Sequence, residues 1–116
     1  MPLRESKNAR RYNERIVLTY SPTIVDDYGH ASLGKPQDVL EVYAYVRQMS
    51  ATKTMMTFQQ ADAIGLDIEF RTPDVEFNGL RYRGHDVFFS TPEDVDGRGR
   101  ILRINGWYQT DNPSNG

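Results

Sequence analysis

Apolar and polar residues alternate strictly along one central stretch of the chain, residues 39–49. An extended strand points successive side chains to opposite faces, so this pattern predicts a long strand with one face on a core and the other partly in water. The apolar face consists of Leu40, Val42, Ala44 and Val46, and the opposite face of Glu41, Tyr43, Tyr45 and Arg47.

Shorter runs predict further strands at residues 15–20, 66–71 and 100–109, the last with a bulge at Asn105-Gly106. Turn-forming residues separate them. Asn78-Gly79 between apolar neighbours predicts a two-residue type I′ hairpin, Gly84 predicts a break or bulge, and residues 94–99 predict a second hairpin turn. Ser21-Pro22 and the Asp- and Gly-bearing stretch 26–30 predict a long loop over residues 21–37.

Residues 50–65 interrupt the strand pattern. Ser50 or Thr52 could cap a helix and Gly65 could end it, which predicts a short helix over residues 54–63 inside a longer loop. Its methionines and phenylalanine lack core periodicity, so it either caps one barrel end or packs on another subunit. The candidate inter-subunit or channel-facing residues are Thr52, Lys53, Thr54, Met55, Met56, Phe58, Gln59 and Gln60.

The sum of these elements predicts a mainly β fold. We expect a small antiparallel β-barrel or sandwich of five to seven strands, with one short helix or long loop inserted around 50–65. One domain of residues 15–109 would be flanked by a flexible basic arm, 1–14, and a loose tail, 110–116. Ile, Leu, Val and Phe make up only 26 of the 116 residues, which agrees with polar segments outside the core.

Charge is unevenly distributed. Residues 1–15 carry a net charge of +3 and the remainder −5. The basic segment is either a solvated arm or one that docks on an acidic neighbour or touches phosphate. Its candidate docking residues are Arg4, Lys7, Arg10 and Arg11.

Composition and motifs exclude several classes of function. The chain lacks cysteine, so it has no disulfide, thiolate nucleophile or Cys-based metal site. The residues around Asp94 and Gly97 fail the ligand pattern of a calcium loop, and no nucleophile motif or phosphate loop occurs. The two histidines, His30 and His85, are interpreted as turn or edge residues and not as metal ligands. We therefore predict no enzyme activity, no cofactor and no metal. No segment is apolar enough to be a membrane span or a signal peptide.

Nucleic-acid binding is a rival interpretation. A pI near 5.6 argues against a dedicated duplex-DNA binder. However, Arg81-Tyr82-Arg83 interleaves cations with an aromatic ring, as in barrels of the OB type that bind single strands. The alternative for this segment is an exposed edge strand with Tyr82 packed sideways.

Four local features, in this order and spacing, resemble the phage head–tail joining family, the head-closure or stopper proteins of long-tailed phages. Residues 15–20 are similar to the family's first strand, and Asp27-Tyr28-Gly29 to its D-x-Y-G turn. Residues 43–50 resemble its W-A-x-V-x-x-x-S strand, with Tyr43 in place of Trp. Residues 77–82 resemble its late [DN]-G hairpin. The insertion start Lys53-Thr54 and the longer 91–106 stretch depart from the family.

The resemblance implies a structural protein of the virion, made in the cytoplasm of the bacterial host. Such proteins form a homo-oligomeric ring with a portal or adaptor ring on the head side and tail-terminator or other tail proteins on the other. The ring closes the head after DNA packaging, lets DNA pass without specific binding and supports tail attachment. A tail-terminator or tail-completion ring protein is the alternative in the same class.

Overall fold

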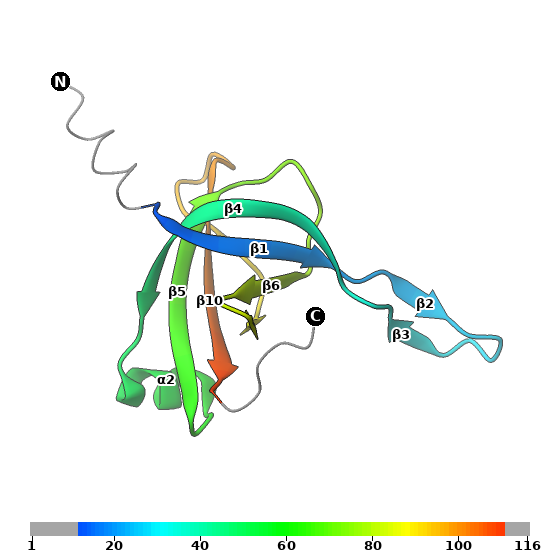
Figure 1. Ribbon diagram of the computed structural model, residues 1–116, viewed down its shortest axis with the longest axis horizontal. Helices are drawn as coiled ribbons and strands as arrows, with labels where there is room; N and C mark the ends of the chain where they lie inside the picture. The colour runs from blue at the N-terminus through cyan, green and yellow to red at the C-terminus, as the bar shows by residue number, and fades with distance from the viewer. Residues whose placement is uncertain (1–11, 111–116) are drawn as a thin grey trace.

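A single antiparallel sheet curls into a nearly closed barrel, which confirms the predicted mainly β fold (Figure 1). The computed structural model describes residues 12–110. The strand order is β7-β6-β1-β4-β5-β10-β8, with β9 also paired to β10 and β2-β3 forming a separate two-stranded sheet. The elements are β1 (Glu14–Tyr20), β2 (Thr23–Val25), β3 (Ala31–Leu33), β4 (Gln37–Gln48), α2 (Ala51–Phe58), β5 (Ala63–Arg71), β6 (Gly79–Tyr82), β7 (His85–Asp86), β8 (Phe88–Phe89), β9 (Glu93–Asp94) and β10 (Ile101–Gln109).

The long strand β4 connects the two halves of the barrel by changing its partner. Its first part, up to Ala44, pairs with β1, and its last part, from Tyr45, pairs with β5. The predicted alternation is confirmed: Ala44 is fully buried, while Glu41 and Tyr43 are exposed. Leu40 is the exception on the apolar face, with 36% of its surface exposed.

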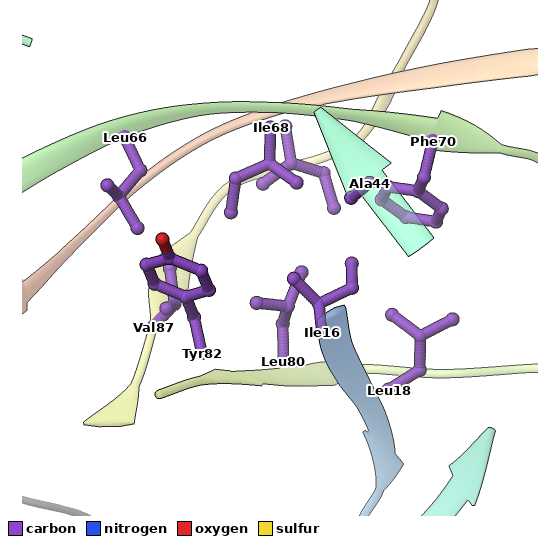
Figure 2. Packing of buried hydrophobic residues seen from close by; sticks show 10 residues of the cluster. Ile16, Leu18, Ala44, Leu66, Ile68, Phe70, Leu80, Tyr82 and Val87 are labelled. Carbon is purple, nitrogen blue, oxygen red and sulfur yellow. The ribbon is translucent and has the colours of Figure 1, made fainter. Parts of the chain in front are cut away.

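The core lies inside the barrel, where inward-facing side chains of several strands meet (Figure 2). Ile16 and Leu18 from β1 face Ile68 and Phe70 from β5, and all four are completely buried. Phe77, from the loop before β6, packs its ring edge on Phe70 at 6.0 Å between centroids. Burial of large apolar side chains such as these supplies most of the stability of a domain of this size.

The predicted type I′ turn at Asn78-Gly79 is wrong. Neither residue has a positive φ, and Gly79 instead begins β6 opposite Thr19, whose hydroxyl would collide with any Cβ at that position. The type I′ turn is formed by Arg83 and Gly84, with φ of 51° and 79°, between β6 and β7. Gly84 therefore makes the turn and does not bulge a strand.

Of the two predictions made for β10 and the turn before it, one is confirmed and one is wrong. The hairpin turn predicted at residues 94–99 is confirmed, since β9 pairs with β10 and the Asp94 carboxylate accepts a hydrogen bond from the Gly99 N–H at 2.9 Å. The predicted bulge is wrong, because β10 keeps one continuous register with β5. Gly106 is needed for close packing: a Cβ there would lie 2.6 Å from Cγ1 of Val87.

The helix in the insertion is displaced towards the N-terminus from the predicted range of 54–63. Ser50 caps it, with its hydroxyl accepting from the Lys53 N–H at 3.1 Å. It ends at Gln59, whose left-handed conformation (φ 56°) turns the chain towards β5. Gly65 lies inside β5 and does not end the helix. Among residues 12–110, no helix is long and apolar enough to cross a membrane.

Candidate interaction surface

Strands β2 and β3 form a hairpin that projects from the barrel, and we call Thr23–Leu33 the projecting hairpin (Figure 1). The predicted long loop over residues 21–37 is therefore wrong in part. The excursion between β1 and β4 exists, but its three-residue strands are too short to show alternation in the sequence. Every residue of β2 and β3 is exposed, and neither strand pairs with a strand of the described barrel.

The projecting hairpin and the chain that returns from it expose an unusual amount of apolar surface. Six of the twelve exposed large hydrophobic residues within 12–110 lie between Ile24 and Leu40. Val25 and Leu33 are 62% and 70% exposed, and they share one face because they pair directly with Ala31 and Thr23. A two-stranded hairpin is marginally stable in water and a continuous apolar face is a mark of contact surfaces, so this face needs a cover.

The tip of the projecting hairpin is ordered by Asp26. Its carboxylate accepts hydrogen bonds from the N–H groups of Tyr28 at 2.9 Å and His30 at 2.8 Å. Gly29 adopts the positive φ of 81° that this turn requires. The turn leaves Tyr28 87% exposed, so an aromatic side chain is presented at the tip of the projecting hairpin.

The root of the projecting hairpin is fixed by Asn78. Its side-chain amide accepts from the Ser21 N–H and donates to the Ser21 carbonyl, both at 2.8 Å. The Asn78 N–H also donates to the Thr19 carbonyl at 3.0 Å. Just beyond this point, Tyr20 pairs with Gln37, so the two ends of the excursion lie side by side.

The helix α2 contains most of the residues predicted as an inter-subunit or channel loop. Thr54 is buried, and its hydroxyl donates to the Ser50 carbonyl at 2.9 Å. It contacts β5 so closely that a Cβ added to Gly65 would lie 2.5 Å from Oγ1 of Thr54. On the other side, Met55 and Met56 are 46% and 76% exposed. The helix thus packs on β5 through one side and leaves its methionines in solvent.

The other predicted site residues have ordinary positions. Thr52 is exposed, Phe58 and Gln60 are half-buried, and Gln59 is the C-cap of α2. Contact of any of these residues with another subunit stays a prediction. The candidate docking residues Arg4, Lys7, Arg10 and Arg11 lie outside the described residues.

The outer wall of the barrel carries charges in matched pairs. Arg47 contacts Asp67 at 3.0 Å, and Arg103 contacts Glu69 at 3.4 Å. These two ion pairs belong to the lining of a groove of about 340 Å³, which contains three acidic and three basic side chains. It is lined by Tyr45, Arg47, Lys53, Asp67, Ile68, Glu69, Glu93, Arg103 and Asn105. Within residues 12–110, no group of three His, Asp or Glu side chains is placed to hold a metal ion.

The segment that favoured single-strand binding does not form a stacking surface. Tyr82 is only 6% exposed and belongs to the core, and burial raises the pKa of its hydroxyl. Arg81 and Arg83 are engaged with Asp38 at 2.8 Å and Glu14 at 2.9 Å. Because base stacking needs an accessible ring, this alternative loses the residue on which it depended.

The sequence reasoning missed the apolar face of the projecting hairpin. The available signal was Ile24-Val25 and Leu33 on either side of the Asp26–Gly29 turn chemistry. A five-residue connection between two short apolar runs is compatible with a hairpin. The two breakers Pro22 and Pro36 instead favoured an irregular loop.

No protein-family model matches the chain, and no curated protein matches it. Among solved structures, it is similar to protein SF1141 from Shigella flexneri 2a, a structural-genomics target determined in solution. The TM-score is 0.59 at 16% sequence identity, and the match covers 88% of this chain and 96% of the other. At this identity the similarity shows a shared fold and nothing about activity.

Proposed function

We propose that the chain is a ring subunit of the phage neck, located between the portal or adaptor and the tail. In this position it closes the head after DNA packaging and supports attachment of the tail. The observation that carries the proposal is the projecting hairpin, a built, apolar and uncovered surface on a small barrel. The order of the sequence features that resemble the head–tail joining family supports the same assignment, although Asn78-Gly79, in the fourth of them, does not form the hairpin turn.

The distribution of side chains favours assembly over chemistry. Large apolar side chains are exposed to solvent at the projecting hairpin and at the methionines of α2. The charged groove on the barrel wall contains ion pairs that neutralise each other. Surfaces of this kind bind protein partners, and a ring is built when one subunit uses two different surfaces.

The charge of the described barrel suits a channel for DNA. Residues 12–110 carry 14 acidic and 10 basic side chains. If the face towards the channel shares this excess of negative charge, it offers phosphates few cations, and packaged DNA passes without being held. The basic residues of the N-terminal segment, outside this range, would then serve to dock on an adjacent ring.

The test is a nonsense mutation of this chain in the phage that encodes it. We expect DNA-filled heads that lack tails and lose DNA, and we expect purified chain to restore joining when such heads are mixed with free tails. Tails of irregular length on otherwise complete particles would instead assign the chain to the tail terminator. A normal yield of tailed, infectious particles would overturn the proposal.

A further inference from the structure

Two uncovered apolar surfaces lie at opposite ends of one strand. The projecting hairpin leads into the start of β4, and α2 follows directly after its end. At about 3.3 Å per residue, the path along the twelve residues of β4 is roughly 36 Å long. Figure 1 shows the projecting hairpin and α2 on opposite sides of the barrel. Within a single copy, therefore, neither surface can cover the other.

The two surfaces are suited to each other in shape and chemistry. The hairpin presents β-branched and branched side chains, Val25 and Leu33, on one flat face. The helix presents Met55 and Met56, whose unbranched thioethers adapt to an uneven partner. Contact between them would remove large exposed apolar side chains of both from water.

Charge favours this pairing over contact between two identical surfaces. The tip of the projecting hairpin carries the exposed carboxylates of Asp26 and Asp27. The helix carries no acidic residue, and its charged side chain is the exposed Lys53. Two hairpins placed tip to tip would bring like charges together, whereas hairpin and helix bring opposite charges together.

We infer that the projecting hairpin of one copy docks on α2 of the next copy, with Val25 and Leu33 on Met55 and Met56. The inference rests on the proposed ring, and it names the contact that joins neighbouring subunits. Because the two surfaces differ, the contact is head-to-tail, and repeated contacts close into a ring when the rotation between copies permits it.

Chemical cross-linking tests the contact directly, because the chain lacks cysteine. Val25→Cys and Met56→Cys chains are mixed at micromolar concentration and treated with a short bismaleimide. The matched control replaces Met56→Cys with Ser90→Cys, which places a thiol at another exposed position. Docking raises the local thiol concentration towards the millimolar range, so the hairpin–helix product should form at least about tenfold faster than the control product.

Charge reversal provides a second test in which both thiols keep their positions and only the charges change. Lys53→Glu in the helix partner should slow the hairpin–helix cross-link severalfold, and Asp27→Lys in the hairpin partner should restore it. Equal rates with the Met56→Cys and Ser90→Cys partners would overturn the inference. So would a Val25→Cys homodimer as the main product, because it would show hairpins that pair with each other.

The outcome for the contact is independent of the outcome for the proposed function. If the cross-link fails while a nonsense mutant still lacks tails, the chain belongs to the neck but its subunits meet elsewhere. If the cross-link forms while the mutant makes normal tailed particles, the subunits meet as inferred but the ring has another role.

Discussion

The position of α2 depends on one close contact, and Gly65→Ala tests it. A Cβ on Gly65 would lie 2.5 Å from Oγ1 of Thr54, 3.0 Å from Sδ of Met49 and 3.2 Å from Cβ of Thr54. Favourable contacts between carbon atoms occur at about 3.5–4.0 Å, so the helix must shift or the strand must bend. Because β5 pairs with its neighbours on both sides at this end, we expect the helix to move.

The magnitude follows from two opposing effects. Overpacking a well-packed site costs about 1–3 kcal/mol. Replacement of glycine by alanine restricts the unfolded chain and recovers about 0.4–1 kcal/mol. The difference is about 0–2.6 kcal/mol. Because the new Cβ would lie only 2.5 Å from Oγ1 of the buried Thr54, we expect Gly65→Ala to lower the free energy of unfolding by about 1–2 kcal/mol. At about 4 °C per kcal/mol for a domain near this size, the melting temperature should fall by about 4–8 °C.

Thr54→Ala completes the argument as a double-mutant cycle. Alone, it removes the hydrogen bond to the Ser50 carbonyl, worth about 0.5–1.5 kcal/mol, and a buried methyl group. Combined with Gly65→Ala, it also removes the oxygen that the new Cβ would meet. The double variant should therefore be more stable than the sum of the single effects predicts, by about 1 kcal/mol.

Urea unfolding followed by tryptophan fluorescence measures these free energies. Trp107 is the single tryptophan of the chain, and it lies opposite Gly65 in the pairing of β10 with β5. Circular dichroism serves as the control for the whole barrel. Strict additivity of the two substitutions, or a neutral Gly65→Ala, would refute the idea that this contact positions the helix.

Three further predictions concern the core, the projecting hairpin and the loop between β9 and β10. Ile68→Ala, at a completely buried position, should cost about 2–5 kcal/mol in urea unfolding; a cost below 1 kcal/mol would contradict the assigned core. Replacement of residues 21–36 by Asn-Gly should leave the barrel folded, with unchanged near-ultraviolet circular dichroism. The loss of the hydrogen bonds between Asn78 and Ser21 should cost about 1–3 kcal/mol. An unfolded product would show that the projecting hairpin supports the barrel. The Arg98 N–H, together with the Arg100 guanidinium, lowers the pKa of Asp96. The contribution of Asp96 to stability is therefore present at neutral pH and lost as the pH falls through that lowered pKa. Titration by NMR should give a higher pKa for Asp96 in Arg100→Gln, and an unchanged pKa would exclude a role for the guanidinium.

The alternation of apolar and polar residues predicted the barrel strands well because these strands have one buried face and one face towards solvent. The long strand β4 shows this most clearly, since Ala44 is fully buried, Tyr45 beside it is half-buried, and Glu41 and Tyr43 on the opposite face are exposed. Turn chemistry was less reliable. Asn78-Gly79 has the composition of a type I′ turn, but tertiary contacts use both residues for other purposes, the amide to bind Ser21 and the glycine to fit against Thr19. Arg83-Gly84 makes the turn without an Asn-Gly signature.

The candidate interaction surface was likewise indicated only in part by the sequence. Met55 and Met56 lack core periodicity in the sequence and are exposed in the structure, while their contact with another subunit stays a prediction. The apolar runs at Ile24-Val25 and Leu33 are compatible with a hairpin, but they do not show which side chains share a face, because that depends on which residues of two three-residue strands pair. In a hairpin the register is fixed by the conformation of the turn, and a shift of one residue exchanges the two faces.

The two hydrogen bonds between Asn78 and Ser21 hold the root of the projecting hairpin, so a small rotation there produces a larger displacement at the tip. From Thr23 to Tyr28 the hairpin extends about 17 Å at 3.3 Å per residue, so a rotation of about 10° at the root moves the tip by about 3 Å. A displacement of that size separates two touching side chains. The accuracy with which the tip meets a partner therefore depends on contacts at the base, among them the amide of Asn78, a residue that need not touch the partner at all.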